Sequence, residues 1–168
     1  MMKYELVAAQ TRDLEDVYRI IDDRIHWMDD KGIEQWNKTD YWGVYPKEHY
    51  IQYMEEGILY VMKRTSDAKV VGVVALLRND PRWPDGFEVS AYYLHHLATD
   101  LSVKGIGKEI IAQCEELGKA NKKAFIRLDC AVDNAFLNAY YQGLGYHICG
   151  SCIDGAYQGT LREKRLQY

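Results

Sequence analysis

A glycine-rich turn between a strand-like run and a helix-like run constrains this chain most. The turn reads Lys104-Gly105-Ile106-Gly107-Lys108, follows the extended run 88–99 and opens a stretch with helical apolar spacing. Glycine lacks a Cβ atom, so the backbone can turn tightly and bring its N–H groups close to an anion at a helix N-terminus. Most Gly-x-Gly pairs are ordinary turns. Here the preceding strand, the following helix and the two flanking lysines together predict a phosphate-binding turn.

Length and composition limit the class of protein. The chain has 168 residues, of which 48% are hydrophobic and 27% charged, which favours one globular domain over residues 1–168. A formal net charge of −4 argues against a nucleic-acid partner, because such proteins carry a basic face. No stretch approaches the ~20 apolar residues that cross a bilayer, and the first residues lack the apolar run of a secretory signal. We therefore expect a cytoplasmic protein with no membrane partner.

Apolar spacing predicts a mixture of strands and helices. Val17, Ile21 and Ile25 follow Thr11 at helical spacing, and Thr11 is suited to cap that helix. The expected strands are 3–9, 58–64, 69–77, 88–99, 124–131, 146–153 and 157–166, and the expected helices are 11–30, 46–56, the run that opens after Gly105, and 134–144. This order predicts an α/β fold with a single mixed β-sheet of about seven strands and helices on both faces.

Motifs in the second half of the chain resemble those of one superfamily. They are Tyr92 to Thr99 followed by the glycine turn, then Arg127-Leu128-Asp129-Cys130, Asn134, and the run Tyr140 to Tyr146. Together they resemble the GNAT superfamily of acetyl-CoA-dependent N-acetyltransferases. The resemblance implies a GNAT-like fold, acetyl-CoA as the cofactor and coenzyme A as a product. Two departures are present: Ser102 stands where the family usually has Gln or Arg, and the loop before Gly105 is about two residues shorter, which leaves the strand register open between Leu97 and Thr99.

The resemblance also implies where the cofactor binds. Amides of the glycine turn would hold the pyrophosphate, and a helix N-terminus adds a partial positive charge. The peptide-like pantetheine arm would lie beside the end of the preceding strand, where Asn134 reaches it, although an Asn at that position is equally suited to cap a helix. The cofactor-binding residues implied are Leu97, Ala98, Thr99, Val103, Lys104, Gly105, Ile106, Gly107, Lys108 and Asn134.

Two proton-transfer groups follow from the resemblance and from the chemistry. Tyr141 matches the family's tyrosine, which can protonate the departing thiolate; packing in the core is the alternative, and Tyr140 is the substitute. His95 lies where several relatives carry a catalytic Glu, and an imidazole suits a general base near neutral pH. Glu88 or Asp129 acting through a water molecule is the alternative base.

Aromatic residues in the first half of the chain indicate the acceptor. In this family the first two helices and their loop form the acceptor pocket, which places Gln35, Trp36 and Trp42 there. Acidic residues nearby favour a cationic amine through Coulomb and cation–π attraction. The expected substrate is a small-molecule amine, while core packing of these aromatics, a non-catalytic acyl-CoA-binding regulator and a protein or peptide N-acetyltransferase stay open. The long C-terminal strand allows for a homodimer.

Cysteines give little indication of metal or redox chemistry. Cys149 and Cys152 have the spacing of a redox or zinc pair, but zinc requires two further ligands and the chain has no second Cys pair. We expect no metal.

Overall fold

The computed structural model describes residues 3–168, which form two compact units. The first unit comprises the chain up to Ala75 together with His96–Gln113, and the second comprises Leu76–His95 together with Cys114–Tyr168. Each unit is described by itself below. The predicted organisation as one domain over 1–168 stays a prediction.

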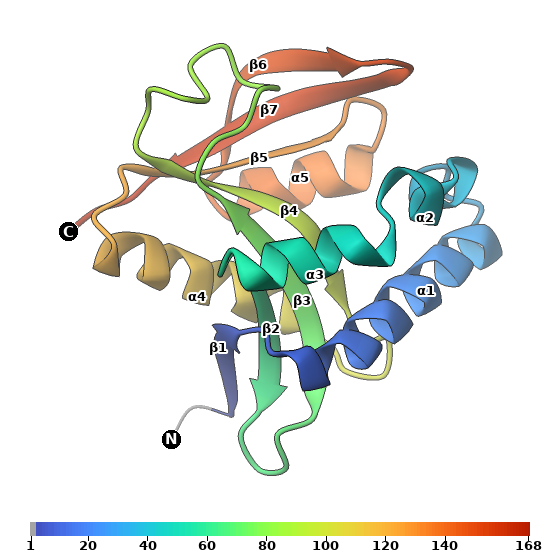
Figure 1. Cartoon of the computed structure of the whole chain (residues 1–168). Helices are drawn as coiled ribbons and strands as arrows, with labels where there is room; N and C mark the ends of the chain where they lie inside the picture. Colours follow the sequence, from blue (N-terminus) through green and yellow to red (C-terminus); the bar gives the residue numbers. More distant parts are fainter. Residues whose placement is uncertain (1–2) are drawn as a thin grey trace. The chain divides into compact units, whose positions relative to one another are not determined.

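Seven strands form one mixed sheet in the order β1-β2-β3-β4-β5-β7-β6 (Figure 1). Strand β4 pairs with β5 in parallel, whereas β1 with β2, β2 with β3, β5 with β7 and β6 with β7 pair antiparallel. The predicted α/β fold with a mixed seven-stranded sheet is therefore confirmed. The strands are β1 Tyr4–Ala8, β2 Leu59–Arg64, β3 Val70–Leu77, β4 Ala91–Thr99, β5 Phe125–Ala131, β6 His147–Asp154 and β7 Tyr157–Arg165.

Between residues 3 and 168, five α-helices and two 3-10 turns connect these strands. Helix α1 buries Val17, Ile20 and Ile21 completely, as its helical apolar spacing predicts. It ends at Gly32, whose φ of 67° is a left-handed conformation that glycine adopts without strain. The helices are α1 Leu14–Lys31, α2 Tyr41–Val44, α3 Lys47–Glu55, α4 Ile106–Ala120 and α5 Ala135–Gly143, and the 3-10 turns are Thr11–Asp13 and Trp36–Lys38.

Two predicted boundaries are wrong. Thr11 does not cap α1, because the Asp13 carboxylate accepts the hydrogen bond from the Gln10 amide at 2.9 Å and Thr11 begins a 3-10 turn. Strand β4 starts at Ala91 instead of Glu88. The amides of Glu88 and Val89 donate to the Asp85 carbonyl at 3.1 and 3.2 Å, so these residues close a turn before the strand begins.

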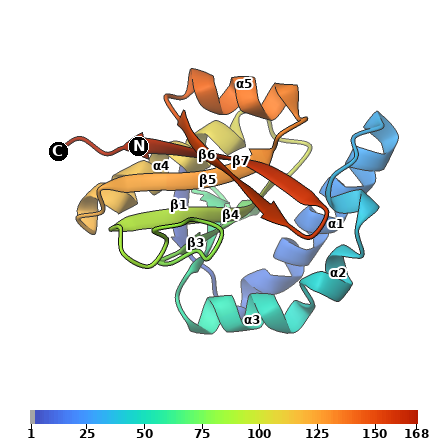
Figure 2. The ribbon, with the colours of Figure 1, turned by 90° about the horizontal axis from the view of Figure 1, so that it is seen from above.

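In the first unit, helices cover both faces of the strands. Figures 1 and 2 show α1 and α3 on one side of β2 and β3, and α4 on the other. The side of α4 is fixed by Gly72 of β3, since a Cβ atom there would lie 2.6 Å from Ile110 Cδ1 and 3.2 Å from Ile106 Cγ2. The absence of a side chain at Gly72 therefore lets the start of α4 pack directly on the sheet, next to the glycine turn.

The second unit is closed on one face by the loop 78–90. Trp83 from this loop packs in a buried cluster with Tyr93, Cys152 and Leu161. Arg127 of β5 lies beneath it, with its guanidinium carbon 4.3 Å from the Trp83 ring centroid. Arg127 pairs with Asp85 at 2.7 Å and with Glu163 at 2.9 Å. These contacts hold the loop against the strands, which matters because the loop carries Asp80.

Candidate active site

The two histidines of β4 have different surroundings. The hydrogen bond between His95 and Asp80 lies in the second unit, whereas His96 contacts Tyr41 of α2 and His49 of α3 in the first. His96 has a φ of 55°, a left-handed conformation that is uncommon for a residue with a side chain. This local reversal separates two side chains that lie next to each other in the sequence.

His95 binds a buried carboxylate. Its Nε2 lies 2.7 Å from Asp80 Oδ2, and the Asp80 side chain is only 3% exposed. The other Asp80 oxygen accepts a hydrogen bond from the Arg82 amide at 2.9 Å. Burial raises the pKa of Asp80, but the hydrogen bond with His95 and the other contacts outweigh it and lower the pKa below its usual value. An ionised carboxylate only accepts hydrogen bonds, so Nε2 is the donor and Nδ1 carries the lone pair of the neutral ring.

Asp129, the alternative base, lies in the same cluster. Its Oδ2 accepts hydrogen bonds from Tyr157 Oη at 2.6 Å and from Arg82 at 3.3 Å. Asp80, His95 and Asp129 each offer one possible ligand atom. These three atoms lie within 4.8 Å of one another, a spacing that suits a cation. Arg82 already supplies a positive charge there. Glu88, the other alternative, is exposed in the loop 78–90.

His96 lies in an aromatic cluster. Its Nδ1 is 2.9 Å from Tyr41 Oη and 3.3 Å from Tyr50 Oη, and its Nε2 is 3.2 Å from Nε2 of His49. Tyr41 and Tyr50 also share a short hydrogen bond. Burial raises the pKa of both phenols, so they stay neutral. The sequence alone gave no role to Tyr41, His49 or Tyr50, although the density of aromatic residues between 41 and 53 is the signal that marks this cluster.

The predicted acceptor residues lie at the edge of this cluster. The rings of Trp36 and Trp42 pack on Tyr41 with centroids 5.1 and 5.4 Å away. Trp42 Nε1 donates to Asp22 at 2.6 Å. Gln35 precedes the 3-10 turn, and its amide donates to Asn37 at 2.9 Å. The structure therefore brings Trp36 and Trp42 together around one buried tyrosine, with a carboxylate next to Trp42.

The glycine turn has the backbone of a helix start. Gly105 has a φ of 81°, which explains the need for glycine. The Asp100 side chain accepts hydrogen bonds from the amide and hydroxyl of Ser102 at 2.9 and 2.6 Å. Glu109 is the first residue of the turn and helix whose amide donates back, to the Gly105 carbonyl at 3.3 Å. The amides before it, 104–108, belong to the helix start, where N–H groups lack intrahelical acceptors.

Two details modify the expectations for the cofactor residues in the first unit. The Val103 amide donates to the Asp100 carbonyl at 3.2 Å, so it is partly committed to the turn. The Thr99 carbonyl and hydroxyl accept from Arg24 at 3.1 and 2.8 Å. Ala98 is buried, whereas Leu97 is half-buried. The parallel pairing of β4 with β5 covers only Ala91 to Tyr93 among the described residues.

Asn134 and Tyr141 belong to the second unit. Asn134 caps α5, since its Oδ1 accepts from the Leu137 amide at 2.9 Å. Tyr141 is buried, with its ring 5.4 Å from that of Tyr140 and 6.0 Å from that of Tyr146. Burial raises the pKa of Tyr141, and nearby Cys130 adds to the effect. The half-buried Tyr140 also has a raised pKa because of burial.

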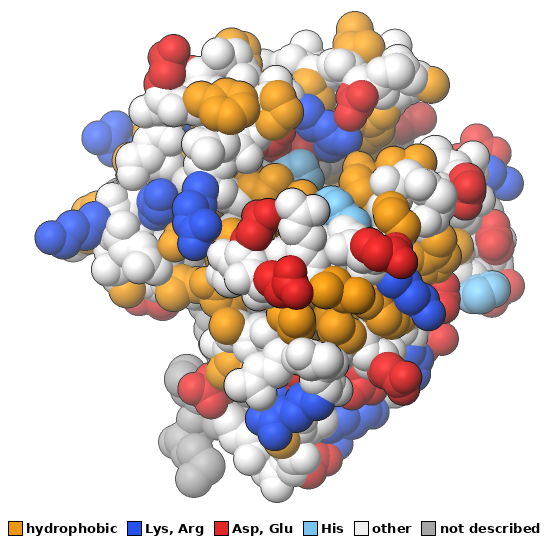
Figure 3. Space-filling model, viewed as in Figure 1, with side chains coloured by type: hydrophobic (Ala, Val, Ile, Leu, Met, Phe, Trp, Pro, Cys, Tyr) orange, Lys and Arg blue, Asp and Glu red, His pale blue; other side chains and the backbone are white. Residues whose placement is uncertain are grey.

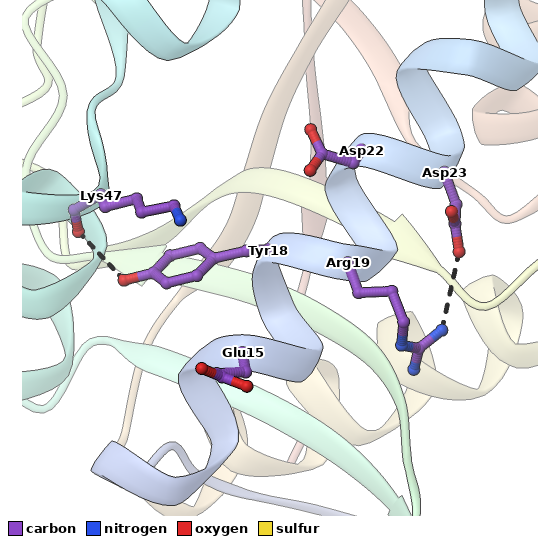
Figure 4. Close-up of a pocket in the computed structure, with 6 residues that line it drawn as sticks. All are labelled: Glu15, Tyr18, Arg19, Asp22, Asp23 and Lys47. Atoms are coloured by element: carbon purple, nitrogen blue, oxygen red, sulfur yellow. Dashed lines mark hydrogen bonds and ion pairs between the residues drawn. The ribbon is translucent and has the colours of Figure 1, made fainter.

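A separate surface cavity of about 340 Å³ lies between α1 and the start of α3 (Figure 4). Six charged or phenolic residues line it: Glu15, Tyr18, Arg19, Asp22, Asp23 and Lys47. Tyr18 donates to the Lys47 carbonyl at 3.3 Å, and Arg19 pairs with Asp23 at 3.6 Å. None of the predicted catalytic or cofactor residues lines this cavity. Its one link to the predicted acceptor residues is Asp22, which lines the cavity and accepts the hydrogen bond from Trp42.

Cys149 and Cys152 are not joined by a disulfide, and they differ in exposure. All four cysteines are free, with Cys149 exposed and Cys152 buried. Burial, with help from Glu163, raises the pKa of Cys149 to about 11, so its thiol is protonated near neutral pH and a poor nucleophile.

Comparison with known proteins identifies the family. The profile of the Acetyltransferase (GNAT) family matches residues 21–146. The chain belongs to this family. The GNAT protein is 29% identical to an uncharacterized N-acetyltransferase, YesJ of Bacillus subtilis (strain 168), over 169 residues that cover 94% of this chain and 88% of that protein. It is thus an acetyl-CoA-dependent acetyltransferase.

Solved structures have the same fold. A GNAT-family acetyltransferase from Listeria monocytogenes 4b F2365 matches with a TM-score of 0.77 and 23% identity, covering 97% of this chain and 95% of that one. The PaiA N-acetyltransferase of Thermoplasma acidophilum, solved in complex with coenzyme A, matches with a TM-score of 0.72 and 18% identity over 98% and 99% of the two chains. Both confirm the GNAT-like fold of this enzyme.

The surface of the GNAT enzyme carries both signs of charge. In Figure 3, lysine and arginine side chains are interspersed with aspartate and glutamate over the face shown. Among the residues that the structure describes, no helix combines the length and apolar character that crossing a membrane requires.

Proposed function

We propose that this GNAT enzyme moves the acetyl group of acetyl-CoA to a primary amine of a small molecule, within one domain spanning residues 1–168. The amine attacks the thioester carbonyl directly, and coenzyme A leaves. The observation that carries this proposal is the glycine turn: Gly105 has the left-handed backbone that opens α4, and the amides 104–108 precede the first helical hydrogen bond. Such a helix start binds phosphate groups well.

The cofactor residues in this proposal are those implied by the family motifs. Lys104, Gly105, Ile106, Gly107 and Lys108 hold the pyrophosphate, with Val103 sharing its amide with the Asp100 carbonyl. The pantetheine arm runs beside Leu97, Ala98 and Thr99. The end of β4 supports this, because the ladder with β5 stops at Tyr93 and a peptide-like ligand can pair with unpaired strand backbone. Asn134 contacts the same arm.

Tyr141 is the proposed acid. Its raised pKa keeps the phenol protonated at neutral pH. A protonated phenol can donate to the thiolate as the C–S bond breaks. Tyr141→Phe should therefore lower kcat with little change in acetyl-CoA affinity, and Tyr140→Phe is the matched control on the same helix.

His95 is the proposed base, and Gln35, Trp36 and Trp42 are the proposed acceptor residues. The contact with Asp80 supports His95, because it leaves the lone pair of the neutral ring on Nδ1. The aromatic cluster with Asp22 beside Trp42 supports a cationic amine, since aromatic faces and carboxylates both attract positive charge. Cytoplasmic location, absence of a nucleic-acid partner and a homodimer stay predictions.

Calorimetric titration of acetyl-CoA, with ATP and NAD as controls, is the first test. We expect micromolar binding of acetyl-CoA alone, followed by release of thiol and an acetylated product in a screen of small amines. Binding without turnover, unaffected by Tyr141→Phe, would instead favour an acyl-CoA-binding regulator. Turnover of peptides but of no small amine would favour a protein or peptide N-acetyltransferase. Failure of acetyl-CoA to bind would overturn the cofactor assignment.

A further inference from the structure

Asp80 is held rigidly by its own loop. Its amide donates to the Gly86 carbonyl at 3.1 Å, and its carbonyl accepts from the Trp83 amide at 3.2 Å. A Cβ atom at Gly86 would lie 1.8 Å from the Asp80 carbonyl oxygen, so only glycine permits this closure. Together with the Arg82 amide bond to Oδ1, these contacts aim Oδ2 at His95. The loop therefore fixes the carboxylate before any substrate binds.

Several charged and titratable groups surround the Asp80–His95 pair. The groups that face it are Arg82 from the same loop, Asp129 from β5, Cys152 and Asp154 from β6, and Tyr157 from β7. Arg82 pairs with Asp129 at 3.3 Å and Asp154 at 3.0 Å. Asp80 accepts hydrogen bonds from the Arg82 backbone amide and from His95. The buried carboxylate therefore holds the His95 ring in one orientation, with Nε2 as the donor.

We infer that Asp80 is a positioning residue for His95, so that the two act as a dyad in acetyl transfer. This inference rests on the proposed function. An N–H bond of the acceptor ammonium breaks and an N–H bond forms at His95 Nδ1, which frees the amine lone pair. The amine then forms the C–N bond as the C–S bond breaks, and Tyr141 protonates the thiolate. The second proton of the amine nitrogen restores Tyr141, and the proton on His95 leaves to solvent.

Variants of the carboxylate test the dyad. Asp80→Asn keeps the shape of the side chain but removes the ionised acceptor that orients His95, so kcat should fall about 10- to 100-fold while the KM for acetyl-CoA stays near the wild-type value. Asp80→Glu should restore part of kcat. Asp85→Asn is the matched control, because Asp85 lies on the same loop and pairs with Arg127 instead; its kcat should match the wild type.

The outcomes distinguish failure of the Asp80–His95 dyad from failure of the proposed function. If His95→Gln abolishes turnover but Asp80→Asn keeps the wild-type kcat, His95 is the base and the dyad is refuted. If His95→Gln keeps the wild-type kcat, the base assignment fails, while acetyl-CoA turnover still establishes the enzyme.

A second measurement does not depend on how the Asp80 variants fold. Nitrogen-15 NMR of histidine-labelled wild-type protein should show the neutral His95 ring protonated at Nε2. The opposite tautomer would overturn the inference.

Discussion

Asn134 can be tested at once for its cap and for the proposed ligand contact, because its side-chain amide carries separate acceptor and donor atoms. Its Oδ1 accepts from the Leu137 amide at 2.9 Å and so caps α5. The Nδ2 hydrogens take no part in this cap, and we expect them to donate to the pantetheine arm. A variant that keeps the oxygen and loses the NH₂ group separates the cap from the ligand contact.

The expected magnitudes follow from the two roles. Asn134→Ala loses the cap, which costs about 1 kcal/mol and lowers Tm by roughly 2–4 °C for a chain of this size. Asn134→Asp keeps a cap acceptor and adds a negative charge at a helix N-terminus, which is favourable, so its Tm should stay near the wild type. Both variants lose the donor to the cofactor, and a lost neutral hydrogen bond of about 1 kcal/mol corresponds to a roughly five-fold weaker Kd for coenzyme A.

The assay is thermal unfolding without ligand, together with calorimetric titration of coenzyme A. Asn138→Ala is a useful comparison, since Asn138 Nδ2 donates to the Asn134 carbonyl at 3.0 Å but takes no part in the cap. Equal Tm values for Asn134→Ala and the wild type would refute the capping argument. An unchanged Kd in both Asn134 variants would refute the ligand contact and leave Asn134 as a cap alone.

Two further predictions concern stability. Arg127→Met should lower the free energy of unfolding by about 2–3 kcal/mol in urea titration. Loss of a fully buried pair costs ~3–5 kcal/mol, but the partners Asp85 and Glu163 are 43% and 24% exposed and can hydrate once Arg127 is gone. A loss under 1 kcal/mol would contradict this role. Asp100→Asn tests whether ionisation of Asp100 stabilises the fold. Burial raises the pKa of Asp100, but hydrogen bonds with Ser102 and Lys69 outweigh burial and lower the pKa in the folded state from 3.8 to about 2. Its carboxylate therefore stabilises the fold above about pH 4 by at most ~2 kcal/mol. The wild type should lose this advantage over Asp100→Asn as the pH falls toward 2, and a difference independent of pH would show that ionisation is not its source.

Local patterns were enough to predict most elements of this fold. Helix α1 and strand β3 follow directly from apolar spacing, and the predicted strand 69–77 differs from Val70–Leu77 by one residue. The left-handed Gly105 was predictable because glycine is the residue that tolerates this backbone. Helix α2 was missed, since four residues are too few to show a helical period.

Long-range contacts could not be predicted in the same way. Asp80 and His95 are 15 residues apart, and their contact depends on the closure of a loop that Gly86 and Trp83 make together. Arg127 meets Glu163 across 36 residues, because β7 inserts between β5 and β6 in the sheet. No local pattern encodes either pairing. The left-handed φ of His96 is also invisible in sequence, because nothing distinguishes His96 from His95 there.

The two adjacent histidines have different hydrogen-bond partners. His96 Nε2 lies 3.2 Å from Nε2 of His49, and its Nδ1 lies within hydrogen-bond distance of the phenols of Tyr41 and Tyr50. His95 instead donates to the carboxylate of Asp80 at 2.7 Å. An ionised acceptor forms a stronger hydrogen bond than a neutral phenol does, so Asp80 is the partner that can orient a catalytic ring. We therefore expect His96→Gln to change acceptor KM or stability and to leave kcat unchanged in steady-state assays.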